Sequence, residues 1–71
     1  MSKNWNHQNV AMWMLNDESL YRTMRYCIRI SKTKDQAVLN FQRELAKMGI
    51  KRTPNGAPYT KTAIRAAMVG Y

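Results

Sequence analysis

The sequence predicts an all-α fold, a small three- to four-helix bundle of helix-turn-helix-like character. Apolar residues recur at helical spacing in four segments, and no long run alternates apolar with polar side chains as a half-buried strand would. A chain of 71 residues has room for one domain, so we expect residues 1–71 to fold as a single unit. A core of this size is marginal, and we expect a homodimer or another bound partner to stabilise it further.

The first expected helix covers residues 8–15. Val10, Trp13 and Met14 are spaced three and four residues apart, which places them on one helical face. The other positions are also mostly apolar, so this helix is expected to lie between other elements.

A second helix is expected over residues 17–30. Asn16 can cap it, and Asp17 and Glu18 then lie in the first turn, where the helix dipole favours negative charge. The pattern leaves open whether this helix is separate from the first or continues it through a kink. Its inward stripe consists of Leu20, Met24, Cys27 and Ile28.

The third helix, over residues 34–48, has the clearest boundaries. Thr33 and Gln36 form the Thr-x-x-Gln pattern of a capping box, with Thr33 at the N-cap. Gly49 stands where a left-handed residue is expected after the helix. The inward stripe consists of Ala37, Val38, Phe41, Leu45 and Met48.

Residues 50–58 cannot form a helix, because they contain Pro54, Pro58 and the pair Asn55-Gly56. Asn-Gly favours the primed turns of tight hairpins. Each proline removes a hydrogen-bond donor from a strand ladder. The sequence therefore predicts a short Pro/Gly turn, or at most a rudimentary hairpin, before the last helix.

Thr60 can cap a fourth helix, which Gly70 is placed to end. The side chains of Lys61, Thr62 and Arg65 then point away from the core. The inward face consists of Ala63, Ile64, Ala67 and Met68.

Charge is the feature that bears most directly on function. The chain carries 12 Lys and Arg against four Asp and Glu, a formal net charge of +8. This excess favours an acidic partner, with nucleic acid first, an anionic membrane second and an acidic protein surface third. Residues 47–71 carry cations and no acid, and the second helix carries an arginine stripe with spacings of three and four.

Enzyme activity is not expected, and we assign no catalytic residue. The adjacent acids Asp17 and Glu18 point about 100° apart on a helix, so they do not form a facing carboxylate pair. Cys27 lies on an apolar stripe, which is typical of an inert core thiol. One His and one Cys cannot make a structural zinc site, and no phosphate-binding glycine loop is present. We therefore expect no metal and no cofactor.

The sequence also lacks the features of a membrane or secreted protein. No segment is long and apolar enough to span a bilayer, and the N-terminus has no secretory signal. No helix combines a large exposed apolar face with a basic one, so binding to a membrane surface is not expected either. With a single cysteine, a reducing and cytoplasmic location is the expectation.

Residues 45–65 combine a helix end, a Thr-Pro-x-Gly turn, an aromatic residue and a Thr-opened helix. The matching positions are Leu45, Gly49, Ile50, Thr53, Pro54, Gly56, Tyr59, Thr60 and Ile64. This arrangement resembles part of the DNA-binding domain of large serine recombinases, in which Trp commonly occupies the position of the tyrosine. The resemblance implies a helix-turn-helix segment that binds DNA. Because the catalytic serine domain is absent, it does not imply recombination.

Three short motifs mark the N-terminal half: Trp5-Asn6, Val10-Ala11-x-Trp13 and Asn16-Asp17-Glu18-x-Leu20-Tyr21. They resemble the start of short uncharacterised bacteriophage proteins. The resemblance implies a phage-encoded accessory or regulatory protein in the host cytoplasm, and it transfers no biochemical activity.

The leading hypothesis is a small basic protein that binds duplex DNA. The last helix would read bases in the groove, while the turn and the second helix would hold phosphates. The expected contacts are Arg22, Arg25 and Arg29 on the second helix, Lys51 and Arg52 in the turn, and Lys61, Thr62 and Arg65 on the last helix.

The alternative hypothesis is a phage-encoded inhibitor or adaptor that binds an acidic surface of a host protein. The same arginines would then surround Tyr26, because arginine and tyrosine are the side chains typical of protein–protein hot spots. The positions of the basic side chains in the fold discriminate between the two hypotheses.

Overall fold

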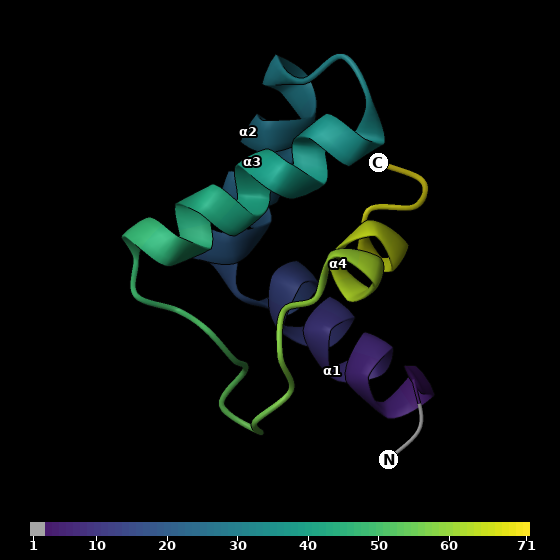
Figure 1. The fold of residues 1–71 in the computed structure, drawn as a ribbon, viewed down its shortest axis with the longest axis vertical. Coiled ribbons are helices and arrows are strands. Elements are labelled where there is room, and N and C mark those ends of the chain that lie inside the picture. The colour runs from purple at the N-terminus through teal and green to yellow at the C-terminus, as the bar shows by residue number, and fades with distance from the viewer. Residues whose placement is uncertain (1–2) are drawn as a thin grey trace.

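A computed structural model describes residues 3–71, with side chains from Trp5 onward, and Figure 1 shows its fold. Residues 3–71 form no strand, and one isolated antiparallel bridge joins Arg52 to Pro58. The four helices are α1 (Lys3–Asn16), α2 (Glu18–Ile30), α3 (Lys34–Lys47) and α4 (Lys61–Ala67). The predicted all-α bundle with a rudimentary hairpin before its last helix is confirmed.

The helices pack as a ring around the core. Helix α1 contacts α2 and α4, and α3 likewise contacts α2 and α4. Within residues 3–71, α2 does not pack against α4, nor α1 against α3. Figure 1 shows α4 beside α1, with α2 lying behind α3. Helices α2 and α4 are therefore placed diagonally in the ring.

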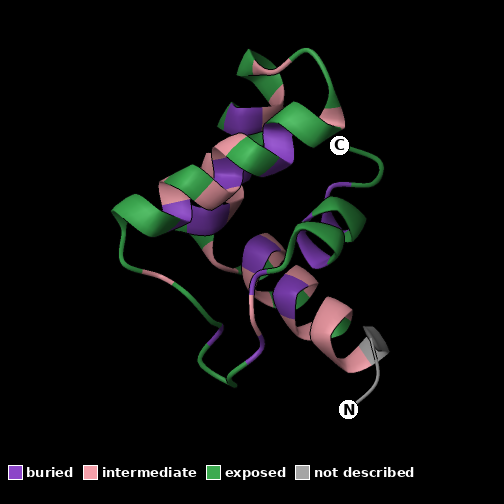
Figure 2. Cartoon of the chain, in the orientation of Figure 1, coloured by how far each residue is buried: buried purple, intermediate pink, exposed green. Residues whose placement is uncertain are grey.

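One core serves all four helices, and each contributes a large side chain that is fully buried. These side chains are Met14 from α1, Met24 from α2, Phe41 from α3 and Ile64 from α4. Figure 2 shows the buried residues on the sides of the helices that face one another. Helices of 7 to 14 residues are marginal in isolation, so this shared burial supplies most of their stability.

Helix α1 begins at Lys3, five residues before the predicted start. Trp5 packs against the core and extends the helix toward the N-terminus. The helix ends at Asn16 because Asp17 has extended backbone angles (ψ 119°) and caps α2, with its Oδ1 accepting from the amide of Leu20 at 3.0 Å. Two separate helices therefore form, and Asp17 rather than Asn16 is the N-cap.

Helix α3 has the caps that its sequence predicts. Thr33 Oγ1 accepts from the amide of Gln36 at 3.1 Å. At the other end Gly49 has φ +74°, and the amide of Ile50 donates to the carbonyl of Leu45 at 2.9 Å, which completes a Schellman motif. The buried stripe is shorter than predicted.

Met48 does not belong to the core, so its place in the predicted stripe was wrong. It is the C-cap residue of α3, and 42% of it is exposed because it lies at the free end of the helix.

Thr53 organises the turn between α3 and α4. Its carbonyl accepts from the amide of Gly56 at 2.8 Å, and its buried Oγ1 accepts from the amide of Ala57 at 3.0 Å. Gly56 has φ +92°, whereas no residue other than glycine has a positive φ in the described chain. The turn is therefore centred on Pro54-Asn55 and closed by a left-handed glycine.

The primed turn expected at Asn55-Gly56 was wrong. It needs positive φ at Asn55, whereas Pro54 fixes a negative φ one residue earlier and starts the turn there. Two side-chain bonds attach the hairpin to the bundle: Gln42 Nε2 donates to the carbonyl of Tyr59 at 3.3 Å, and Asn55 Nδ2 donates to Asn9 Oδ1 at 2.9 Å.

We predict that Thr53→Val lowers the free energy of unfolding by about 1–3 kcal/mol, because it leaves the buried amide of Ala57 without an acceptor. Urea denaturation followed by circular dichroism measures this. Thr53→Ser is the matched control, since it keeps the hydroxyl and should retain most of the stability. A valine variant as stable as the wild type would contradict the role assigned to Thr53.

Candidate functional site

All eight side chains predicted to contact DNA are exposed in the structure. They do not form one surface. They occupy three places, namely the outward side of α2, the hairpin between α3 and α4, and the outward side of α4.

The outward side of α2 carries a continuous stripe of exposed residues at spacings of three and four. Tyr26 and Ile30 are 55% and 53% exposed, although both are large and apolar. The buried residues of α2 lie on the opposite side of the helix. We call this stripe the α2 outer face; it consists of Arg22, Arg25, Tyr26, Arg29 and Ile30.

Arg25 is held in place by two tyrosines. Its Nη1 donates to Tyr21 Oη at 2.9 Å, and its guanidinium lies 5.8 Å from the ring centre of Tyr21 and 5.9 Å from that of Tyr71. The two rings meet edge to face, with centres 6.1 Å apart. Lys34 fixes the segment that carries Tyr71 by donating to the carbonyls of Met68 and Tyr71.

The other two arginines of this face differ in their partners. Arg22 pairs with Glu18 one turn earlier, and both side chains are 76% exposed. Within the described chain, Arg29 has neither an ion pair nor a hydrogen-bond partner. Ion pairs between exposed side chains contribute little, so Arg22 can exchange Glu18 for another anion. Arg29 has no pair to break, so both arginines remain available to an external anion.

The two cations of the hairpin, Lys51 and Arg52, line different hollows. Arg52 Nη1 donates to the carbonyl of Gly56 at 3.1 Å and lines a hollow together with Trp13 and Asp17. Lys51 lines a separate hollow beside α3. Neither hollow includes a residue of α4, so the hairpin does not extend the surface of the last helix.

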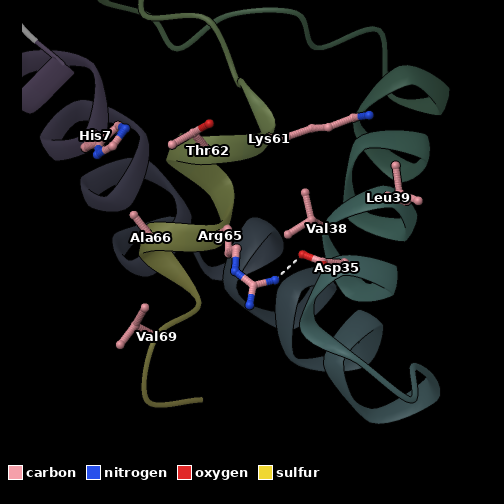
Figure 3. Close-up of a pocket in the computed structure, with 9 residues that line it drawn as sticks. All are labelled: His7, Asp35, Val38, Leu39, Lys61, Thr62, Arg65, Ala66 and Val69. Carbon is pink, nitrogen blue, oxygen red and sulfur yellow. Dashed lines mark hydrogen bonds and ion pairs between the residues drawn. The ribbon is translucent and has the colours of Figure 1, made fainter.

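The outward side of α4 forms the floor of an open hollow between α1 and α3, shown in Figure 3. The hollow has a volume of about 610 Å³, and its surface is mostly apolar. Arg65 is paired there with Asp35 of α3, and Lys61 reaches toward α3. We call it the α4 hollow; Figure 3 labels the residues that line it, from His7 on α1 to Val69 after α4.

The predicted DNA-binding set is therefore split between separate surfaces, because no residue of the α2 outer face lines the α4 hollow. The α2 outer face and the α4 hollow belong to diagonal helices that do not contact each other. Helix α4 does not project from the surface either, because α1 and α3 flank it. The sequence did not indicate the tyrosine pair around Arg25, which joins residues 50 positions apart. The sequence contained one indication of the hollow: Leu39 is apolar but does not belong to the stripe of α3 that faces the core.

The described residues show no arrangement for metal or thiol chemistry. Residues 3–71 contain no group of three or more His, Cys, Asp or Glu that could hold a metal ion. Cys27 is fully buried, and desolvation, followed by the charge of Glu44, raises the pKa of its thiol. No helix of the described chain has the length and apolar character needed to cross a bilayer.

No protein-family model, no curated protein and no solved structure matches this chain. The resemblances to recombinase and phage proteins therefore stay hypotheses.

We predict that Cys27 in the native protein reacts with iodoacetamide far more slowly than in urea at pH 8, because the buried thiol has a raised pKa and no access to reagent. A thiol whose folded pKa lies above its unfolded value contributes stability below about pH 9, and this contribution is lost as the pH rises further. Mass spectrometry of the alkylated protein gives both rates. Equal rates would contradict a buried core thiol.

Proposed function

We propose that this protein binds duplex DNA through the α2 outer face. The observation that carries the proposal is the alignment of three exposed arginines on one rigid helix. From Arg22 to Arg29 the helix rises about 10 Å. Over that axial distance one DNA strand carries about three phosphates. Three long, flexible side chains along this length can therefore each reach a different phosphate of one strand.

The surroundings of the α2 outer face favour an anionic partner. Residues 19–34 contain no Asp or Glu, and Lys32 extends the cationic stretch beyond Arg29. Asp17 and Glu18 lie at the start of the stripe beside Arg22, and the exposed pair of Glu18 with Arg22 is weak enough for a phosphate to replace it. The tyrosines around Arg25 restrict its side chain before binding, which lowers the entropic cost of the contact.

The α4 hollow is less suited to DNA than the α2 outer face. Arg65, one of the three expected base readers, lies in the concave floor of the hollow rather than on a projecting surface. The flanking helices α1 and α3 also keep α4 from entering a groove as a projecting recognition helix does. Among the predicted contacts, the DNA proposal therefore rests on Arg22, Arg25 and Arg29.

An acidic protein surface is the second candidate for the same face. Tyr26 and Ile30 support it, because large exposed apolar side chains between arginines are typical of protein–protein hot spots. In the setting implied by the N-terminal resemblance, the first candidate is a phage accessory or regulatory protein. The second is a phage-encoded inhibitor or adaptor.

We predict that the double variant Arg22→Ala/Arg29→Ala binds a duplex at least about tenfold more weakly than the wild type at low salt, because two charged contacts are lost. The slope of log K against log salt should fall by about 1.8, which corresponds to two phosphates. Fluorescence anisotropy with a labelled duplex at several salt concentrations measures both quantities.

The matched control is Lys51→Ala/Lys61→Ala, which removes the same charge from exposed side chains outside the α2 outer face. Its affinity should stay within about threefold of the wild type. Equal losses in the two double variants would show non-specific charge attraction and contradict the assignment of the face. No binding by the wild type at low salt would reject DNA as the partner.

A further inference from the structure

We infer that the α4 hollow is a second binding surface, which docks an acidic peptide segment carrying an apolar anchor side chain. This surface is distinct from the α2 outer face and does not depend on DNA binding there. Apolar and cationic side chains line the same concave surface.

The apolar part of the hollow is uncovered by the rest of the described chain. Leu39 is 42% exposed and Val69 is 74% exposed, although both are aliphatic. Val38 is buried beneath them, and Ala66 leaves room above the floor. A volume of about 610 Å³ lies within the range of concave sites that enclose a bound group. An apolar side chain placed there would remove these carbons from water.

The charged part of the hollow favours a negatively charged occupant. Lys61 lies at its edge and, within the described chain, has no ion pair or hydrogen bond. Arg65 lies at the other side of the floor, and its exposed pair with Asp35 leaves most of its donors free. Asp35 also lines the hollow, but its pair with Arg65 offsets its charge, so Lys61 leaves the hollow with a net positive charge.

A second copy of this chain is a poor occupant. It would bring a further net charge of +8. Three of its four acids already pair with neighbouring cations of their own chain. Duplex DNA is also a poor fit for the hollow. Its charged phosphates would lose water against the apolar lining and gain no apolar contact in return. An acidic segment with an apolar anchor satisfies both parts of the lining.

Fluorescence anisotropy with two labelled peptides tests this inference. The first probe is a 16-residue peptide of Glu and Leu, with the leucines on one helical face. In the second probe every Leu is replaced by Ser, which keeps the charge. We expect the leucine peptide to bind the full chain at least about tenfold more tightly, because burial of the anchors adds to the charge attraction. Equal affinities would overturn the inference.

Two matched pairs of variants locate the site. Leu39→Glu should weaken binding of the leucine peptide about tenfold or more. Met12→Glu adds the same charge at a residue of similar exposure (41%) outside the hollow, and it should have little effect on that affinity. Lys61→Ala should lower the affinity for the leucine peptide about threefold, and Lys51→Ala should leave that affinity unchanged. Equal losses within either pair would overturn the assignment of the hollow.

Competition separates this inference from the DNA proposal. With labelled peptide bound, a saturating duplex should leave it in place, because no residue of the α2 outer face lines the α4 hollow. Displacement of the peptide by the duplex would overturn the claim of two surfaces. A duplex that fails to bind at all rejects the DNA proposal and leaves the peptide result standing by itself.

Discussion

Four carboxylates face twelve lysines and arginines in this chain, and each carboxylate has a specific place in the structure. Asp17 caps α2 with an extended backbone, and so separates α2 from α1. Asp35 pairs with Arg65 and joins α3 to α4. Glu18 and Glu44 pair with cations one turn away on their own helices. The remaining cations lack a carboxylate, and they give the surface its attraction for an anionic partner.

Most of those cations lie on separate surfaces, among them the α2 outer face and the α4 hollow. Helices α2 and α4 do not pack against each other, and the α2 outer face and the α4 hollow share no residue. The two surfaces also differ in kind. The α2 outer face presents arginines in line along one helix, which suits a phosphate backbone. The α4 hollow is concave and mostly apolar, which suits a side-chain anchor. One small core thus displays two surfaces with different chemistry.

Local features were predictable from the sequence, and long-range contacts were not. The caps of α3 and α4 and the stop at Gly49 follow from short motifs, because their hydrogen bonds join residues a few positions apart. The exposure of the α2 arginines follows from helical periodicity. The contact of Arg25 with Tyr71 depends instead on how α4 packs, which no local pattern encodes. For the same reason the sequence predicted one patch on the second helix and another around the last helix, and left open which of them faces the partner.

The most direct test of the account is a titration of the ¹⁵N-labelled protein with a short duplex at low salt, followed by amide chemical shifts. We expect the largest shifts along α2, from Arg22 to Ile30 and into Lys32, with the amides of α4 nearly unchanged. The largest shifts at Lys61, Thr62 and Arg65 would contradict the account, because they would show that the recessed helix rather than the α2 outer face meets the DNA.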